Sequence, residues 1–182
     1  EFLSFSNINY DYIFFPAQFW RHKNHLRVLK AFSLLSKEFD SIKIILTGKK
    51  NREYRSIVNL IKELKIKNKV VFFHEVPQKM MPYFFKNSLF TIAPTLHESI
   101  SIPVFEAFQY GSPVCASGIL AIKHQVSDAG LLFNPSSVES IYECIVKLLK
   151  ENELRERLKI KGFERNKFFS TKRFNKKFNK VL

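Results

Sequence analysis

Short apolar runs alternate with longer segments of helical spacing along most of the chain, and this alternation constrains the fold more than any other feature. The apolar runs, each of which predicts a strand, are 12–16, 42–47, 70–74, 89–93, 114–116 and 131–133. The helical segments between them are 24–39, 52–64, 77–85, 103–110 and 121–126. Repeated strand–helix–strand units make neighbouring strands parallel. The sequence therefore predicts an α/β fold with a Rossmann-like, doubly wound parallel sheet and helices on both faces.

The composition is that of one ordinary globular domain. The 182 residues are 46% hydrophobic and 25% charged, which is enough apolar material for a sizeable core. We expect a single domain over 1–182 that closes with a helical segment at about 164–182. Cys115 and Cys144 lie in apolar contexts without metal-ligand spacing or a disulfide framework. They predict reduced core thiols and a cytoplasmic protein.

Two glutamates in segment 92–114, which reads IAPTLHESISIPVFEAFQYGSPV, point to a ligand site. Pro103 is placed to open a helix and Gly111 to end it, so Glu98 lies in the preceding loop and Glu106 about one turn into the helix. Both carboxylates can then face the crevice where open α/β sheets bind ligands. Carboxylates accept hydrogen bonds from sugar or ribose hydroxyls, while backbone N–H groups of 99–102 at a helix N-terminus favour a phosphate.

This segment resembles the signature of the group 1 glycosyltransferases, Pro-Ser-x-x-Glu-Gly-Phe-Gly-x-Pro-x-x-Glu-Ala followed by Gly-x-Pro-Val. The residues in register are Pro94, Thr95, Glu98, Pro103, Glu106, Ala107, Gly111, Pro113 and Val114. Three positions depart from the pattern: Ser99 and Ser101 replace glycines, and Ile100 replaces an aromatic residue. Serine adopts positive φ less readily than glycine, so these departures narrow the conformations open to the loop.

The resemblance implies the C-terminal, donor-binding half of the two-domain fold called GT-B. The chain starts at Glu1 without a methionine and reaches strand-like sequence at once, so we expect a C-terminal piece whose N-terminal acceptor domain is absent. The implied activity is retaining transfer of a hexose from a nucleotide-diphosphate sugar to a glycan, lipid or other acceptor, bound through the missing domain. The implied chemistry needs no metal or other cofactor.

The same resemblance assigns roles to individual residues. Lys23 matches the lysine of the family's Gly-Arg-x-x-x-x-Lys-Gly element, where it would stabilise the departing diphosphate, and Gln18 replaces the arginine. Lys23 and Glu98 are the expected catalytic residues, with Glu98 on the transferred sugar and Glu106 on the ribose. The expected donor-binding set is Gln18, Lys23, Val76, Glu98, Ser99, Ile100, Ser101, Ile102 and Glu106. Taken without the resemblance, the composition of the basic segment 21–25 favours a solvated surface loop.

The strong basic excess leaves further classes of function open. A formal net charge of +14 and a pI of 9.8 imply attraction to polyanions. No RNA-binding signature accompanies the dispersed basic residues, so we expect no nucleic-acid partner. The basic amphipathic segment 172–181 either lies on an anionic membrane surface, which would make the protein peripheral on the cytoplasmic face, or packs on protein. The alternatives to a glycosyltransferase are a nucleotide-sugar 2-epimerase and a basic binding module without chemistry, for nucleic acid or anionic membrane.

Overall fold

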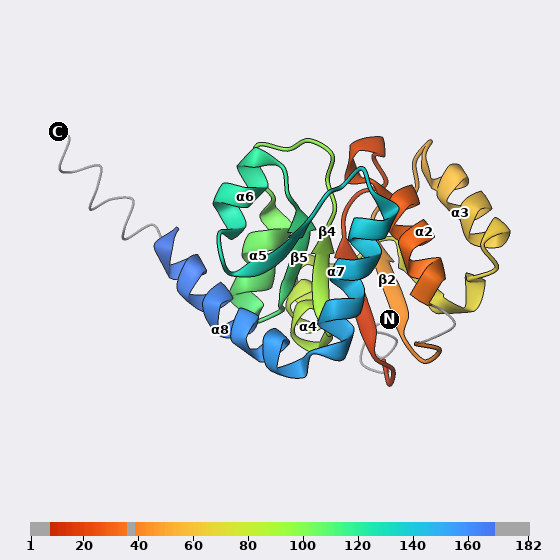
Figure 1. Cartoon of the computed structure of the whole chain (residues 1–182). Helices are drawn as coiled ribbons and strands as arrows, with labels where there is room; N and C mark the ends of the chain where they lie inside the picture. Colours follow the sequence, from red (N-terminus) through yellow and green to blue (C-terminus); the bar gives the residue numbers. More distant parts are fainter. Residues whose placement is uncertain (1–7, 36–38, 170–182) are drawn as a thin grey trace.

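The computed structural model describes residues 8–35 and 39–169, and a six-stranded parallel sheet runs through its centre (Figure 1). The strands are β1 (Tyr12–Pro16), β2 (Lys43–Thr47), β3 (Val70–Phe73), β4 (Phe90–Ala93), β5 (Val114–Ser117) and β6 (Gly130–Phe133). Their order is β3-β2-β1-β4-β5-β6, so the chain moves outward from β1 in one direction and then outward from β4 in the other. This is the doubly wound order, and the predicted Rossmann-like sheet is confirmed.

Helices connect successive strands much as the sequence predicted. They are η1 (Arg21–Lys23), α2 (His25–Leu35), α3 (Tyr54–Glu63), η2 (Lys67–Lys69), η3 (Gln78–Met80), α4 (Met81–Asn87), α5 (Ile102–Tyr110), α6 (Leu120–Val126), α7 (Val138–Lys150) and α8 (Asn152–Phe168). The predicted helix 77–85 is a 3₁₀ turn followed by α4, and α7 together with most of α8 was not predicted. The start of the expected helical segment 164–182 belongs to α8, whereas 170–182, including its basic amphipathic part, lie outside the described residues.

Both faces of the sheet are buried, which explains why its strands are apolar runs rather than alternating sequences. In β1, Ile13 and Phe15 join one core with α2, α3 and α7, while Tyr12 and Phe14 join the other with α4, α5 and α6. The helix α8 follows α7 and crosses to pack against α5 (Figure 1). With both faces covered, the loops at the strand ends are the places left for a ligand.

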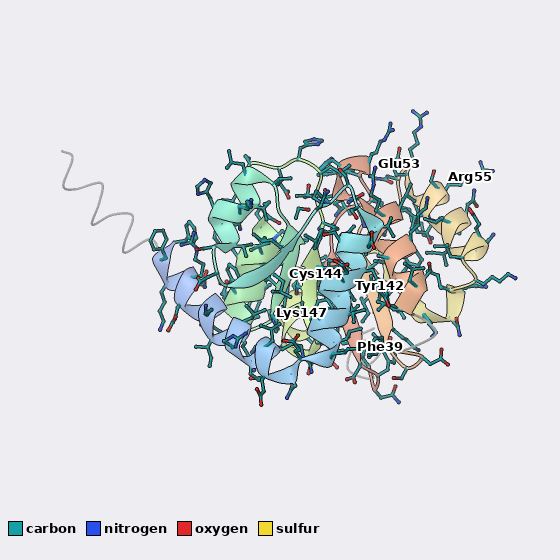
Figure 2. The ribbon with its side chains drawn as sticks, viewed as in Figure 1. Phe39, Glu53, Arg55, Tyr142, Cys144 and Lys147 are labelled. Carbon is teal, nitrogen blue, oxygen red and sulfur yellow. The ribbon has the colours of Figure 1, made fainter. Side chains whose placement is uncertain are left out.

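The two cysteines belong to the core. Cys115 lies on β5, and Cys144 lies on α7, where Figure 2 labels it. Their free thiol sulfurs are 2.8 Å apart. Burial raises the pKa of the Cys115 thiol well above its usual range, so this thiol stays protonated. The prediction of free core thiols is confirmed.

Candidate functional site

A cleft of about 1280 Å³ opens at the carboxyl ends of β1, β2 and β3 and is closed on its far side by the start of α5. Most of the predicted donor-binding residues line it: Gln18, Lys23, Val76, Glu98, Ile100, Ile102 and Glu106. Ser99 and Ser101 are not among its lining residues. The cleft lies beside the β1/β4 boundary, the switch point at which doubly wound sheets bind their ligands.

Lys23 and Glu98 form an ion pair inside this cleft. Lys23 closes the turn η1 after β1, and Glu98 lies in the loop after β4. Their side chains are only 13% and 19% exposed. Water and salt therefore screen this ion pair less than they screen pairs at the surface. The second carboxylate oxygen of Glu98, Oε2, is buried and has no hydrogen-bond partner in the described part of the chain. A carboxylate oxygen buried without a donor is unsatisfied, so Glu98 retains unused acceptor capacity beside the cleft.

Asn24 fixes the position of Lys23, and the sequence reading did not identify it. Its backbone is left-handed, with φ of 64°, and its side-chain amide donates to the carbonyls of Pro94 at 3.1 Å and Pro135 at 2.8 Å. The Leu96 N–H also donates to the His22 carbonyl at 2.7 Å. The bonds with Pro94 and Leu96 tie the turn after β1 to the loop after β4, which brings the ammonium and the carboxylate together, and the bond to Pro135 ties the same turn to the loop after β6.

Glu106 faces the same cleft from the second turn of α5. The side-chain amide of Gln78, the first residue of η3, donates a hydrogen bond of 2.9 Å to Glu106 Oε1. Glu98 and Glu106 therefore have different partners, a cation for the former and a neutral amide for the latter.

The Ser101 amide is bonded within the protein. Its N–H donates to Gln125 Oε1 at 2.9 Å, and Gln125 Nε2 donates back to the Ser101 carbonyl at 2.7 Å. Both side chains are buried. The expectation that Ser101 offers its amide to a phosphate stays a prediction, and in this arrangement a buried glutamine uses that donor. Gln125 clamps the loop that precedes α5.

The floor of the cleft is made where the ends of β1 and β2 press together. Gly48 has φ of +144°, and a Cβ at this position would lie 2.8 Å from the Ala17 carbonyl oxygen. Gln18, at the place of the family arginine, accepts a hydrogen bond from the Lys49 N–H at 2.9 Å. The Gln18 amide oxygen is thus engaged with the backbone, while its NH₂ group remains the donor available to a ligand.

Two aromatic residues that received no role from the sequence also line the cleft. His74 stacks on Phe72, with ring centroids 5.5 Å apart, and its Nδ1 lies 3.4 Å from the Gly48 carbonyl oxygen. Trp20 is 53% exposed at the rim. Behind the cleft, burial lowers the pKa of His25 to about 3, so this imidazole is neutral and packs as an aromatic ring.

Residues 8–35 and 39–169 contain neither a metal-binding cluster nor a membrane-spanning helix. No group of three or more His, Cys, Asp or Glu side chains in these ranges is placed to hold a metal ion. None of the helices there has the length and apolar character needed to span a bilayer.

Fold and cleft together define the class of protein. The parallel doubly wound sheet is Rossmann-like, and the structural neighbours are glycosyltransferases of the GT-B fold. A glycosyltransferase from Rickettsia africae superposes with a TM-score of 0.84 at 18% identity, over 95% of this chain and 47% of that one. At this identity the likeness shows the fold alone.

The chain belongs to the group 1 glycosyl transferases, whose family model matches residues 4–165. It is 28% identical over 149 residues to O-antigen chain mannosyltransferase B of Escherichia coli. The aligned region covers 81% of this chain and 39% of the relative. It is 26% identical over 126 residues to O-antigen chain mannosyltransferase RfbU of Salmonella typhimurium, covering 69% of this chain and 35% of that relative. The chain thus spans less than half the length of the curated relatives it matches. The predicted family is confirmed.

Proposed function

We propose that this chain is the donor-binding half of a retaining glycosyltransferase that takes a hexose from a nucleotide-diphosphate sugar. The observation that carries the proposal is the meeting of Lys23, Glu98 and Glu106 in one cleft at the switch point of the sheet. The cleft offers a cation for phosphates and two carboxylates for hydroxyl groups, which are the chemical parts of such a donor.

Each residue has a separate task in this proposal. The Lys23 ammonium stabilises the charge that grows on the leaving diphosphate, and it does so from a position already fixed by Glu98 and the Asn24 turn. Glu98 accepts hydrogen bonds from the hydroxyl groups of the transferred sugar. Glu106 accepts from the ribose hydroxyls. Lys23 supplies positive charge to the phosphates with no metal ion proposed, and the leaving phosphate assists deprotonation of the acceptor on the same face of the sugar.

We propose that the acceptor is bound by a separate domain, because the chain spans less than half the length of its curated relatives. The curated relatives are named as mannosyltransferases of O-antigen chains, so we propose mannose as the first hexose to test and a glycan or lipid-linked glycan as the acceptor. The net charge of +14 supports a peripheral position on an anionic membrane at its cytoplasmic face.

Calorimetric titration of the chain with UDP, GDP, ADP and dTDP tests the proposal. We expect one nucleotide to bind clearly more tightly than the others, and no sugar transfer from its sugar conjugate, because this chain is proposed to form only the donor side of the site. Trp20 supplies an independent readout, since it is the single tryptophan of the chain and lines the cleft, so its fluorescence should change with the same dissociation constant. Binding of single-stranded RNA without binding of any nucleotide would support the basic binding module instead.

A further inference from the structure

We propose that Gln78 is a positioning residue that holds Glu106 ready for the ribose. This inference rests on the proposed function, because it concerns the part of the cleft assigned to the donor nucleotide. Gln78 and Glu106 are 28 residues apart and approach the cleft from two elements, η3 and α5. Their hydrogen bond joins these elements across the cleft.

The chemistry of this partner suits a carboxylate that must bind hydroxyl groups. In residues 8–35 and 39–169, no cation forms an ion pair with Glu106, and Gln78 is the only side chain that donates to it. A neutral amide orients the carboxylate without neutralising it. An ionised carboxylate has about four acceptor positions, so one bond from Gln78 leaves room for the two hydroxyls of a ribose.

The backbone around Gln78 is itself fixed. Pro77 directly precedes η3, the Met80 N–H donates to the Pro77 carbonyl at 2.8 Å, and α4 begins at the next residue. Gln78 is therefore an exposed side chain on a defined turn. A glutamate held in its binding rotamer loses less side-chain freedom when the ligand arrives, which strengthens binding without a new ligand contact.

The test compares Gln78→Met, which keeps the length of the side chain but removes the amide, with the matched control Gln109→Met. Gln109 is exposed on the same helix as Glu106 and does not line the cleft. The probes are the tightest-binding ribonucleoside diphosphate among UDP, GDP and ADP, its 2′-deoxy counterpart, and inorganic pyrophosphate. All are measured by calorimetry, and thermal denaturation verifies that each variant is folded.

We expect Gln78→Met to weaken binding of the ribonucleoside diphosphate by about three- to tenfold. This is the size expected for the cost of ordering one long side chain. Pyrophosphate binding should not change, and the preference for ribose over deoxyribose should narrow. Gln78→Glu should weaken binding of the ribonucleotide further, because it places a second negative charge beside Glu106. In a Glu106→Gln background, Gln78→Met should have no added effect on the ribose preference.

Three results would overturn the inference. Equal losses for pyrophosphate and nucleotide would show a general change in the cleft. An unchanged ribonucleotide affinity, with the wild type binding normally, would remove Gln78 from the site while leaving the proposed function intact. A wild-type chain that binds none of the nucleotides would overturn the proposed function and this inference together.

Discussion

The Lys23 ammonium and the Glu98 carboxylate form an ion pair that joins the loop after β1 to the loop after β4. These two strands are hydrogen-bonded neighbours at the point where the strand order reverses, although the two residues are 75 positions apart. An ammonium has three donors, so Lys23 can keep Glu98 and still donate to a phosphate. The pair thus links the residue proposed to act on the leaving group with the residue proposed to bind the sugar.

The first prediction concerns the charge of Lys23. Lys23→Met keeps most of the aliphatic volume and removes the ammonium. Binding of the preferred nucleoside diphosphate should weaken by roughly 1.5 to 3 kcal/mol, the range for hydrogen bonds to charged groups, whereas the free nucleoside should lose much less. Calorimetry with both ligands checks this. Equal losses for the two ligands would place Lys23 away from the phosphates.

The stability of the same variants provides the control. Lys23→Met leaves the largely buried Glu98 carboxylate without its cation, so this variant should unfold at a lower temperature than the wild type. Lys23→Met combined with Glu98→Gln removes the unpaired charge and should recover part of that loss. A double variant less stable than Lys23→Met would show that the two residues are not coupled in this way.

The second prediction concerns Gly48. Its φ of +144° is a region that other residues avoid, and a Cβ would press against the backbone of Ala17 and Gln18. Gly48→Ala should lower the free energy of unfolding by about 1 to 3 kcal/mol and should weaken nucleotide binding, because the β1 loop that carries Lys23 must shift. Urea denaturation and calorimetry measure the two effects.

Lys49→Ala is the matched control for this change. The Lys49 side chain is exposed and its 3.9 Å ion pair with Glu75 lies at the surface, so stability should change by less than about 0.5 kcal/mol. A Gly48→Ala variant as stable as Lys49→Ala would mean that the two strand ends are not in close contact.

The elements that sequence patterns predicted well are those buried on both faces or amphipathic. All six strands were predicted within two residues of their ends, since continuous apolar runs mark strands covered on both sides. The helix α7 was missed although Ile141, Ile145 and Leu148 follow helical spacing. The helix α8 was missed for a different reason. Charged residues occupy most of its positions, and among its residues only Leu154, Leu158 and Gly162 are buried, so the apolar pattern is weak.

The sequence predicted which residues form the site better than it predicted the hydrogen bonds between them. The family motif places Lys23, Glu98 and Glu106, and the parallel sheet brings their loops to one edge. The signal for Asn24 was also present, because asparagine stands where the motif has a glycine and is among the residues that tolerate positive φ. The bonds of Gln78 to Glu106 and of Gln125 to Ser101 depend on loop paths and rotamers between distant segments. No local sequence pattern predicts these hydrogen bonds.

The third prediction follows from the buried His25. Its pKa is lowered to about 3 in the folded protein by burial, while the unfolded chain has an ordinary histidine pKa of about 6.5. The unfolded state therefore binds more protons between these values, and the free energy of unfolding falls as the pH drops below 6.5. This one group contributes up to about 1.4 kcal/mol per pH unit.

His25→Phe should remove that contribution, because the ring stays apolar and can keep its stacking on Phe15, 4.2 Å away between ring centroids. Urea denaturation at pH 7, 5.5 and 4.5 should show a shallower loss of stability than the wild type. His124→Gln, a change at an exposed position, is the control and should retain the wild-type slope. An unchanged slope in His25→Phe would mean that His25 takes up its proton without unfolding.

The last prediction separates the two glutamates, since their division of labour carries the proposed function. A ligand at about a hundred times its dissociation constant stabilises the folded state by about 2.7 kcal/mol, which is a melting shift of several degrees for a chain of this size. Glu106→Gln should reduce this shift with the preferred nucleoside diphosphate, because ribose is present in that ligand. Glu98→Gln should keep the shift in full, because the sugar is absent and Lys23 is no longer neutralised by a neighbouring carboxylate.

In the full-length enzyme the order should reverse for turnover. Glu98→Gln should lower kcat, because contacts to the reacting sugar can strengthen in the transition state, while Glu106→Gln should act mainly through donor affinity. Equal loss of the shift in both folded variants would refute the separate roles, and no loss in either would make the two carboxylates structural parts of the loop and of α5.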